Sequence, residues 1–192
     1  MSTLTRAAAA RILAARRQDE LVVPTMTPLA AWHALQQSEL DILGVGAMGS
    51  ASSMALGLAL ARPARKVWVL DGDGSLLMQL GSLATIASAA PGNFYHFVFH
   101  NGVYAFSGSQ DVPGGRSIDF AGMARAAGYP ATFVFDDAES FSTSLEEVLA
   151  KSGPVLVQLK LEPTTEDGLP LREIPLNARE RGARLREILT RV

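Results

Sequence analysis

The sequence contains no cysteine, and this absence removes several classes of site at once. Disulfide bonds, thiolate-bound zinc, cysteine-ligated iron–sulfur clusters and cysteine nucleophiles are all excluded. Long basic runs are also missing, and the formal net charge is −2 at pH 7. The sequence therefore gives no sign of a basic surface that would bind nucleic acid or an anionic membrane. No apolar run reaches the roughly 20 residues that a membrane-spanning helix requires. We therefore expect a cytoplasmic protein that binds neither nucleic acid nor membrane.

What the sequence does have is enough apolar surface for a folded domain. Its 192 residues are 48% hydrophobic, far more than a disordered chain carries. We expect a single domain over residues 1–192, with a core between about residues 18 and 160. A linker-like segment and a charged C-terminal helix packed on the domain are expected within residues 162–192.

Apolar strands and helical patterns alternate along the chain. Strands are expected at residues 20–24, 66–71, 94–100, 131–135 and 155–160, and helices at 4–18, 28–37, 51–61, 78–89, 118–127 and 140–151. Unbroken apolar strands between helices are typical of a parallel sheet covered on both faces, so the predicted fold class is α/β with helices on each side of the sheet. The methionines Met54, Met78 and Met123 are expected in the core.

Oxygen ligands follow two of these strands. The first ends in the acidic, glycine-rich turn Asp71-Gly72-Asp73-Gly74-Ser75, and the next ends in Asn101, 28 residues after Asp73. A carboxylate and an amide oxygen suit Mg²⁺, which tends to share its ligands with a substrate phosphate. Glycine lets the backbone approach a phosphate closely, and the N–H groups that start the following helix favour negative charge. This pattern predicts a Mg²⁺-bridged diphosphate site.

A second glycine cluster supports a different interpretation. Residues 44–49 match the dinucleotide fingerprint G-x-G-x-x-G, and Asp71 follows Gly49 by 22 residues, close to the place of a ribose-binding acid. An NAD-dependent oxidoreductase would fit this spacing, although it leaves the rest of the Asp71–Ser75 turn unexplained. Glycines that serve only tight turns are a further alternative.

With both glycine clusters and Asn101 in view, the chain resembles the pyrophosphate-binding domain of thiamine diphosphate enzymes. Gly72-Asp73-Gly74 and Asn101 match the signature of that family, and the similarity covers roughly residues 18–160. The stretches that begin at Gly46 and at Asp71 are similar in particular to the sulfopyruvate and phosphonopyruvate decarboxylases. The resemblance implies the three-layer α/β/α fold of these enzymes, with thiamine diphosphate and Mg²⁺ as cofactors.

The resemblance also implies roles for individual residues around the metal. Asp73, Asn101 and the main-chain carbonyl of Val103 would bind Mg²⁺.

Further residues would hold the organic cofactor. Gly72, Gly74 and Ser75 form the turn around the diphosphate, with the N–H groups of the last two as donors. Met48 takes the place of the large apolar residue that keeps thiamine bent, and the Gly46 carbonyl would accept a hydrogen bond from the aminopyrimidine.

Two departures from the family pattern mark candidate catalytic residues. His100 replaces the first member of the usual amide or acidic pair, and Ser107 stands where pyruvate decarboxylases carry a catalytic glutamate. A neutral hydroxyl suits a substrate with an anionic tail, which a carboxylate would repel. Phe106 narrows the same space, and Arg116 is a candidate to hold the anionic tail.

The activity implied is decarboxylation of a small 2-oxo acid similar to sulfopyruvate or phosphonopyruvate. In the family, the glutamate that activates the cofactor belongs to a pyrimidine-binding domain, which we do not find in this sequence. We therefore expect an α-type partner subunit, and activity only in a homo- or hetero-oligomer that contains it. The departures at His100 and Phe106 leave a non-catalytic, regulatory cofactor-binding protein as an alternative.

Overall fold

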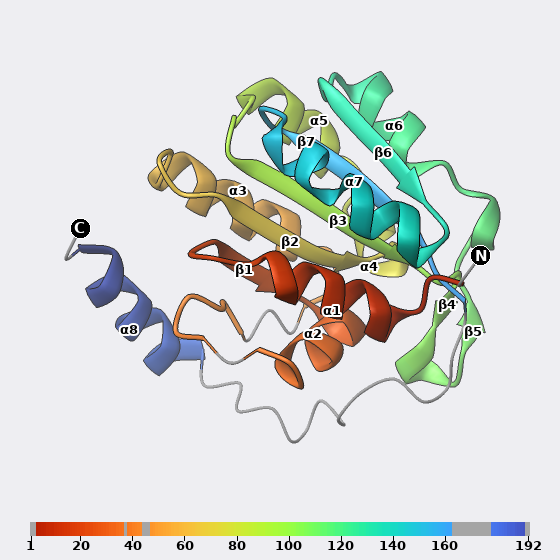
Figure 1. The fold of residues 1–192 in the computed structure, drawn as a ribbon, viewed down its shortest axis with the longest axis horizontal. Helices are drawn as coiled ribbons and strands as arrows, with labels where there is room; N and C mark the ends of the chain where they lie inside the picture. Colours follow the sequence, from red (N-terminus) through yellow and green to blue (C-terminus); the bar gives the residue numbers. More distant parts are fainter. Residues whose placement is uncertain (1–2, 37, 44–46, 163–177, 191–192) are drawn as a thin grey trace.

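The computed structural model describes residues 3–36, 38–43, 47–162 and 178–190, and its centre is a five-stranded parallel sheet (Figure 1). The strands lie side by side in the order β1 (Leu21–Pro24), β2 (Val67–Gly72), β3 (Phe94–His100), β7 (Val155–Lys160) and β6 (Ala131–Phe135). The chain runs from β3 to the edge strand β6 and returns to place β7 between them. All strands therefore point the same way, and their carboxyl ends form one edge.

Helices cover both faces of this sheet. They are α1 (Arg6–Arg16), α2 (Met26–His33), α3 (Ala51–Ala61), α4 (Asp73–Met78), α5 (Ser82–Ala89), α6 (Phe120–Ala127), α7 (Ala138–Ala150) and α8 (Ala178–Thr190). One apolar cluster joins α1, α2 and α7 to one face, and another joins α3, α5 and α6 to the other (Figure 1). The predicted α/β/α layers are confirmed.

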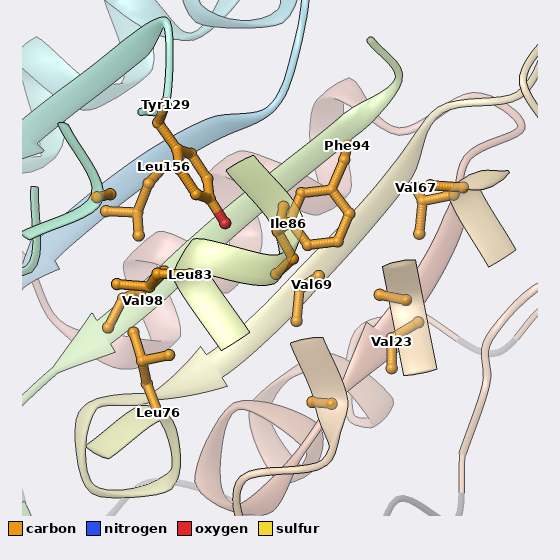
Figure 2. Packing of buried hydrophobic residues seen from close by; sticks show 14 of the residues in the cluster. Val23, Val67, Val69, Leu76, Leu83, Ile86, Phe94, Val98, Tyr129 and Leu156 are labelled. Carbon is orange, nitrogen blue, oxygen red and sulfur yellow. The ribbon is translucent and has the colours of Figure 1, made fainter. Parts of the chain in front are cut away.

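The alternation of side chains along β2 shows why its apolar run is unbroken. Val67 and Val69 belong to the cluster under α3, α5 and α6, whereas Trp68 and Leu70 belong to the opposite cluster. Successive residues of a strand face opposite sides of a sheet, so a strand with both sides covered is apolar along most of its length. Figure 2 shows Val67 and Val69 with Phe94 and Ile86 in the first of these clusters.

Short elements follow β3 at the edge where the strands end. The two-residue strands β4 (Val103–Tyr104) and β5 (Gln110–Asp111) pair antiparallel, with the 3-10 turn η1 (Ala105–Ser107) between them. A second 3-10 turn, η2 (Gly115–Ser117), then leads to α6. The Tyr104 ring of β4 lies against Gly74, at the start of α4.

Three expectations about the helices need correction. The helix expected at 78–89 begins four residues later, as α5 at Ser82, and a separate helix, α4, starts directly after β2 and ends before Gln79, whose φ of −140° is not helical. The helix expected from Pro28 begins two residues earlier, at Met26. The placement of Met54, Met78 and Met123 in the core is wrong, since they are 43%, 56% and 40% exposed.

The C-terminal helix packs on the domain as expected. Leu185 and Leu189 of α8 lie against the cluster under α3, and the Arg62 guanidinium donates to the Leu189 carbonyl at 3.3 Å. Residues 163–177, which hold most of the expected linker, lie outside the described part of the chain. Among the helices that the structure describes, none is both long and apolar enough to cross a membrane.

Candidate cofactor site

The loops that follow β1, β2 and β3 meet in one small pocket at the carboxyl edge of the sheet. Ligands of parallel α/β sheets bind at this edge. The cavity has a volume of about 40 Å³. Eight residues predicted for the site line it, namely Met48, Gly72, Asp73, Gly74, Ser75, Asn101, Val103 and Ser107. Gly46 lies outside the described residues.

Asp73 is the charged group of this pocket. It is the first residue of α4 and only 3% exposed. Its carboxylate accepts hydrogen bonds from the N–H of Gly74 at 2.8 Å and from the N–H of Gly102 at 2.6 Å. Burial raises the pKa of this carboxyl above its ordinary value, although the two N–H groups and nearby His100 oppose the shift. A divalent cation at this place would stabilise the ionised form.

Asn101 brings a neutral oxygen to the same place. Its side chain is buried, and its Oδ1 accepts from the N–H of Val103 at 3.2 Å, which fixes the amide within the turn after β3. The next residue, Gly102, has φ +78° and donates its N–H to Asp73. The turns after β2 and β3 are thus tied together by one hydrogen bond.

The ligand set available for a metal is oxygen-rich. Within the described residues, no group of three or more His, Cys, Asp or Glu side chains is placed to hold a metal ion. One carboxylate with an amide oxygen and a main-chain carbonyl nearby is a donor set that suits Mg²⁺ rather than zinc or a redox metal.

Two positions of the site require glycine, one because of close packing and the other because of its backbone angle. A Cβ atom on Gly74 would lie 2.3 Å from the Tyr104 ring, so only glycine lets that ring lie on the turn. Gly49 has φ +84° and donates its N–H to the Ser75 hydroxyl at 2.9 Å. This bond joins the two glycine clusters and brings Met48 to the pocket.

His100 lies behind Asp73 and outside the pocket lining. Its Nε2 is 3.9 Å from Asp73 Oδ2 and 2.9 Å from the Gly115 carbonyl, and its Nδ1 is 2.9 Å from Nε2 of Gln158. The Gln158 amide donates to Nδ1, so the proton of a neutral ring lies on Nε2 and points to Gly115. At 3.9 Å, Nε2 lies beyond hydrogen-bond distance of Asp73 Oδ2.

Arg116 is not brought to the pocket that contains Ser107. It lines a separate cavity of about 360 Å³ together with three acidic side chains, Asp136, Asp137 and Glu162. Its guanidinium donates to the Leu161 carbonyl at 3.0 Å. The expectation that Arg116 holds an anionic substrate tail therefore gains no support from the structure.

The matching family model decides between the two cofactor hypotheses. It is described as the C-terminal TPP-binding domain of thiamine pyrophosphate enzymes, and it matches residues 25–159. The chain belongs to this family. The match includes both glycine clusters and Asn101, so it decides against the nicotinamide alternative.

Several curated relatives within the thiamine pyrophosphate family are named as decarboxylases. The phosphonopyruvate decarboxylase of Streptomyces viridochromogenes is 42% identical over 164 residues, which are 85% of this chain and 41% of the relative. The sulfopyruvate decarboxylase subunit beta of Methanothermobacter thermautotrophicus is 37% identical over 155 residues, 78% of each chain. The chain thus spans about two fifths of the first relative and most of the second.

Solved structures show the same fold. A thiamin diphosphate-dependent enzyme from Mycobacterium smegmatis superposes with a TM-score of 0.70 at 24% identity, covering 84% of this chain and 32% of the other. The 4-hydroxybenzoylformate decarboxylase of Rhodococcus jostii gives a TM-score of 0.67 at 21% identity, covering 86% and 34%.

Sequence patterns missed four residues of the pocket. Met26 and Thr27 follow β1, and Tyr104 and Ala105 follow the predicted metal ligands. Phe106, expected to narrow the site, also lines it. The rule that ligands bind beyond the carboxyl ends of parallel strands could have identified the first pair, because β1 ends at Pro24.

Proposed function

We propose that this chain is the diphosphate-binding part of a thiamine diphosphate- and Mg²⁺-dependent decarboxylase. Its substrate would be a small 2-oxo acid with an anionic tail, of the sulfopyruvate or phosphonopyruvate kind. The observation that carries this proposal is the pair of buried oxygen ligands, Asp73 and Asn101, on adjacent turns tied by the Gly102–Asp73 hydrogen bond. The decarboxylase names of the relatives support the choice of reaction.

The residues present fit both cofactors. Asp73 and Asn101, with the Val103 carbonyl, would hold Mg²⁺, because a raised carboxyl pKa at a buried site is the state that a bound cation relieves. Gly72, Gly74 and Ser75 would face the diphosphate. When bound, thiamine diphosphate would supply the carbanion that adds to the 2-oxo carbon and the sink for the electron pair released with CO₂.

The chain's own side chains would orient the substrate and keep water out. Ser107 lines the pocket and would offer a neutral hydroxyl to the substrate. Phe106 and Met48 supply apolar walls. His100 would act as a positioning residue, since its Nε2 approaches Asp73 while Gly115 and Gln158 fix its ring.

A partner surface is needed to complete this site. Pockets for ligands of this size measure about 300–1,000 Å³, whereas this one measures about 40 Å³. Several relatives are named as beta subunits of sulfopyruvate decarboxylase. We infer that a pyrimidine-binding, α-type subunit covers the pocket in an oligomer and supplies the activating glutamate.

The surface next to the pocket suits such a partner. Residues 42–61 and 74–110 contain no Lys, Arg, Asp or Glu. Four large apolar side chains in these segments are exposed, namely Met54, Leu60, Met78 and Phe106. The cores of protein interfaces are depleted of charge and enriched in methionine and aromatic residues. We call the exposed surface of the described residues 42–43, 47–61 and 74–110 the uncharged face and assign the α-type subunit to it.

Calorimetric titration tests the proposed function. The purified chain is titrated with thiamine diphosphate, with and without Mg²⁺, first alone and then with the partner subunit, and NADH is the control. Binding that depends on Mg²⁺ is expected. Binding of NADH, or no binding of thiamine diphosphate even with the partner, would overturn the proposal. Binding without decarboxylation in the complete complex would favour the non-catalytic alternative.

A further inference from the structure

Met26 has a backbone conformation that its side chain makes costly. Its φ is +50°, in the left-handed region where the Cβ atom of an L residue is crowded. Among the residues that the structure describes, two other non-glycine residues share this region, Ala90 with φ +46° and Ser109 with φ +57°. Each of the three therefore needs a local reason for its conformation.

Turn geometry explains Ala90 and Ser109. Ala90 ends α5, and its N–H donates back to the Ile86 carbonyl at 2.9 Å. Ser109 follows Gly108 in the turn between η1 and β5, and its N–H donates to the Tyr104 carbonyl at 3.1 Å. A left-handed residue is a common way to end a helix or close a turn.

No such device applies to Met26. It is the first residue of α2, where ordinary helical angles are the rule. The residue before it, Thr25, is fully buried and donates its N–H to the Leu70 carbonyl at 3.0 Å. Strain of this kind clusters at functional sites, where it orients a side chain. Here it leaves Met26 half-buried in the wall of the cofactor pocket.

The pocket wall is of two chemical kinds. Gly72, Asp73, Gly74, Ser75 and Asn101 form its polar part. Two thioethers, from Met26 and Met48, belong to its apolar part together with Phe106. Thioethers are flexible and polarisable, and they make favourable contacts with aromatic rings. The chemistry matches a ligand with a diphosphate joined to a heteroaromatic ring.

We propose that Met26 is a binding residue of this pocket, held in a strained conformation so that its thioether packs against the ring portion of the diphosphate-linked ligand. This assignment rests on the proposed function. The next residue, Thr27, would contact a different part of the ligand, because its hydroxyl in the same pocket suits the diphosphate. Met26 would therefore affect affinity for the whole cofactor, and Thr27 affinity for its diphosphate.

Thermal unfolding tests the strain. Met26→Gly and Met26→Ala both remove the thioether, but only alanine keeps the crowded Cβ atom. The glycine variant is expected to unfold at a temperature about 2–4 °C above that of the alanine variant. Ala90→Gly is the matched control, since it relieves the same conformation at an exposed position at the end of α5. Equal unfolding temperatures for the two Met26 variants would overturn the claim of strain.

Titration tests the binding role with two probes, thiamine diphosphate and inorganic pyrophosphate, each with Mg²⁺. Each variant is titrated alone and with the partner subunit. Met26→Gly is expected to weaken the binding of thiamine diphosphate about tenfold and to leave the binding of pyrophosphate unchanged. Thr27→Val should weaken the binding of both probes, and Ala90→Gly should change the binding of neither.

Two results would overturn the assignment of Met26 and leave the proposed function standing. One is an equal loss of affinity for both probes in Met26→Gly, and the other is unchanged affinity for thiamine diphosphate. A wild-type chain that binds neither probe, even with the partner, would overturn the proposed function and the assignment together.

Discussion

The carboxylate of Asp73 is the residue on which metal binding is expected to depend. Asp73→Asn removes the charge but keeps the shape of the side chain and one acceptor oxygen. Because the ionised oxygen is the strongest Mg²⁺ ligand of the set, thiamine diphosphate affinity in the presence of Mg²⁺ should fall at least about 100-fold. Calorimetry measures the loss, and circular dichroism should show an unchanged fold.

Asp111→Asn is the matched control for this substitution. Asp111 is an exposed acid on β5, one element away from the pocket, and it does not line it. Its replacement should leave affinity unchanged. Wild-type affinity in Asp73→Asn would contradict the assignment of Asp73 as a metal ligand.

Gly74 is a second residue whose identity the structure explains. A Cβ atom there would lie 2.3 Å from Tyr104, so Gly74→Ala must displace the ring from the turn. We expect a loss of about 1–3 kcal/mol in the free energy of unfolding, measured by urea denaturation. In a Tyr104→Ala background the same change should cost much less, because the clash is gone.

Gly57 provides the contrast. It lies in the middle of α3, and a Cβ atom there would meet no atom within 4 Å. Gly57→Ala should therefore raise the free energy of unfolding by about 0.5–1 kcal/mol, since alanine is the better helix former. If Gly74→Ala behaved like Gly57→Ala, the packing of Tyr104 on the turn would be refuted.

At the scale of elements, Gln158 connects β7 to the elements around it. It is fully buried, accepts from the N–H of Ala121, and donates to the Ile118 carbonyl and to His100. Gln158→Leu would leave these groups without partners and should cost about 2–4 kcal/mol of unfolding free energy. Thermal melts measure this, with exposed Gln110→Leu as a control expected to stay within about 0.5 kcal/mol.

Strands were predictable from sequence because burial on both faces makes β2, β3 and β7 apolar at most of their positions. The six residues of α4 were not, because Asp73 and Gly74 are poor helix formers and the helix is held by its place after β2. Sequence also missed Met26, since neither its φ nor its neighbours across the pocket leave a local pattern. Both failures concern positions where tertiary structure overrides local preference.

The exposed methionines show a related limit of sequence patterns. In α3 the residues that face the sheet are the small ones, Ala51, Ala55 and Ala59, and Met54 lies outside the core. A helical apolar pattern cannot distinguish a side chain that packs within the chain from one that packs on a partner. The candidate metal ligands were easier to find, because their residue types and strand-end positions carry the chemistry.

At the scale of the whole molecule, the uncharged face predicts how the chain associates. Met78→Glu would place a charge in the desolvated centre of the proposed interface, and affinity for the α-type subunit should fall about tenfold or more. Met123→Glu on α6 is the matched control, because Met123 is also exposed but lies outside the uncharged face. Light scattering with chromatography measures both. Equal binding by the two variants would refute the assigned interface.

The same face has a consequence for the chain before assembly. A free copy exposes the apolar side chains Met54, Met78 and Phe106, which favours self-association and precipitation. Synthesis of this chain in excess of its partner should therefore yield insoluble material and a substrate for chaperones and proteases, whereas balanced co-expression should keep it in solution. The surface that would complete the active site would also couple the abundance of this chain to that of its partner.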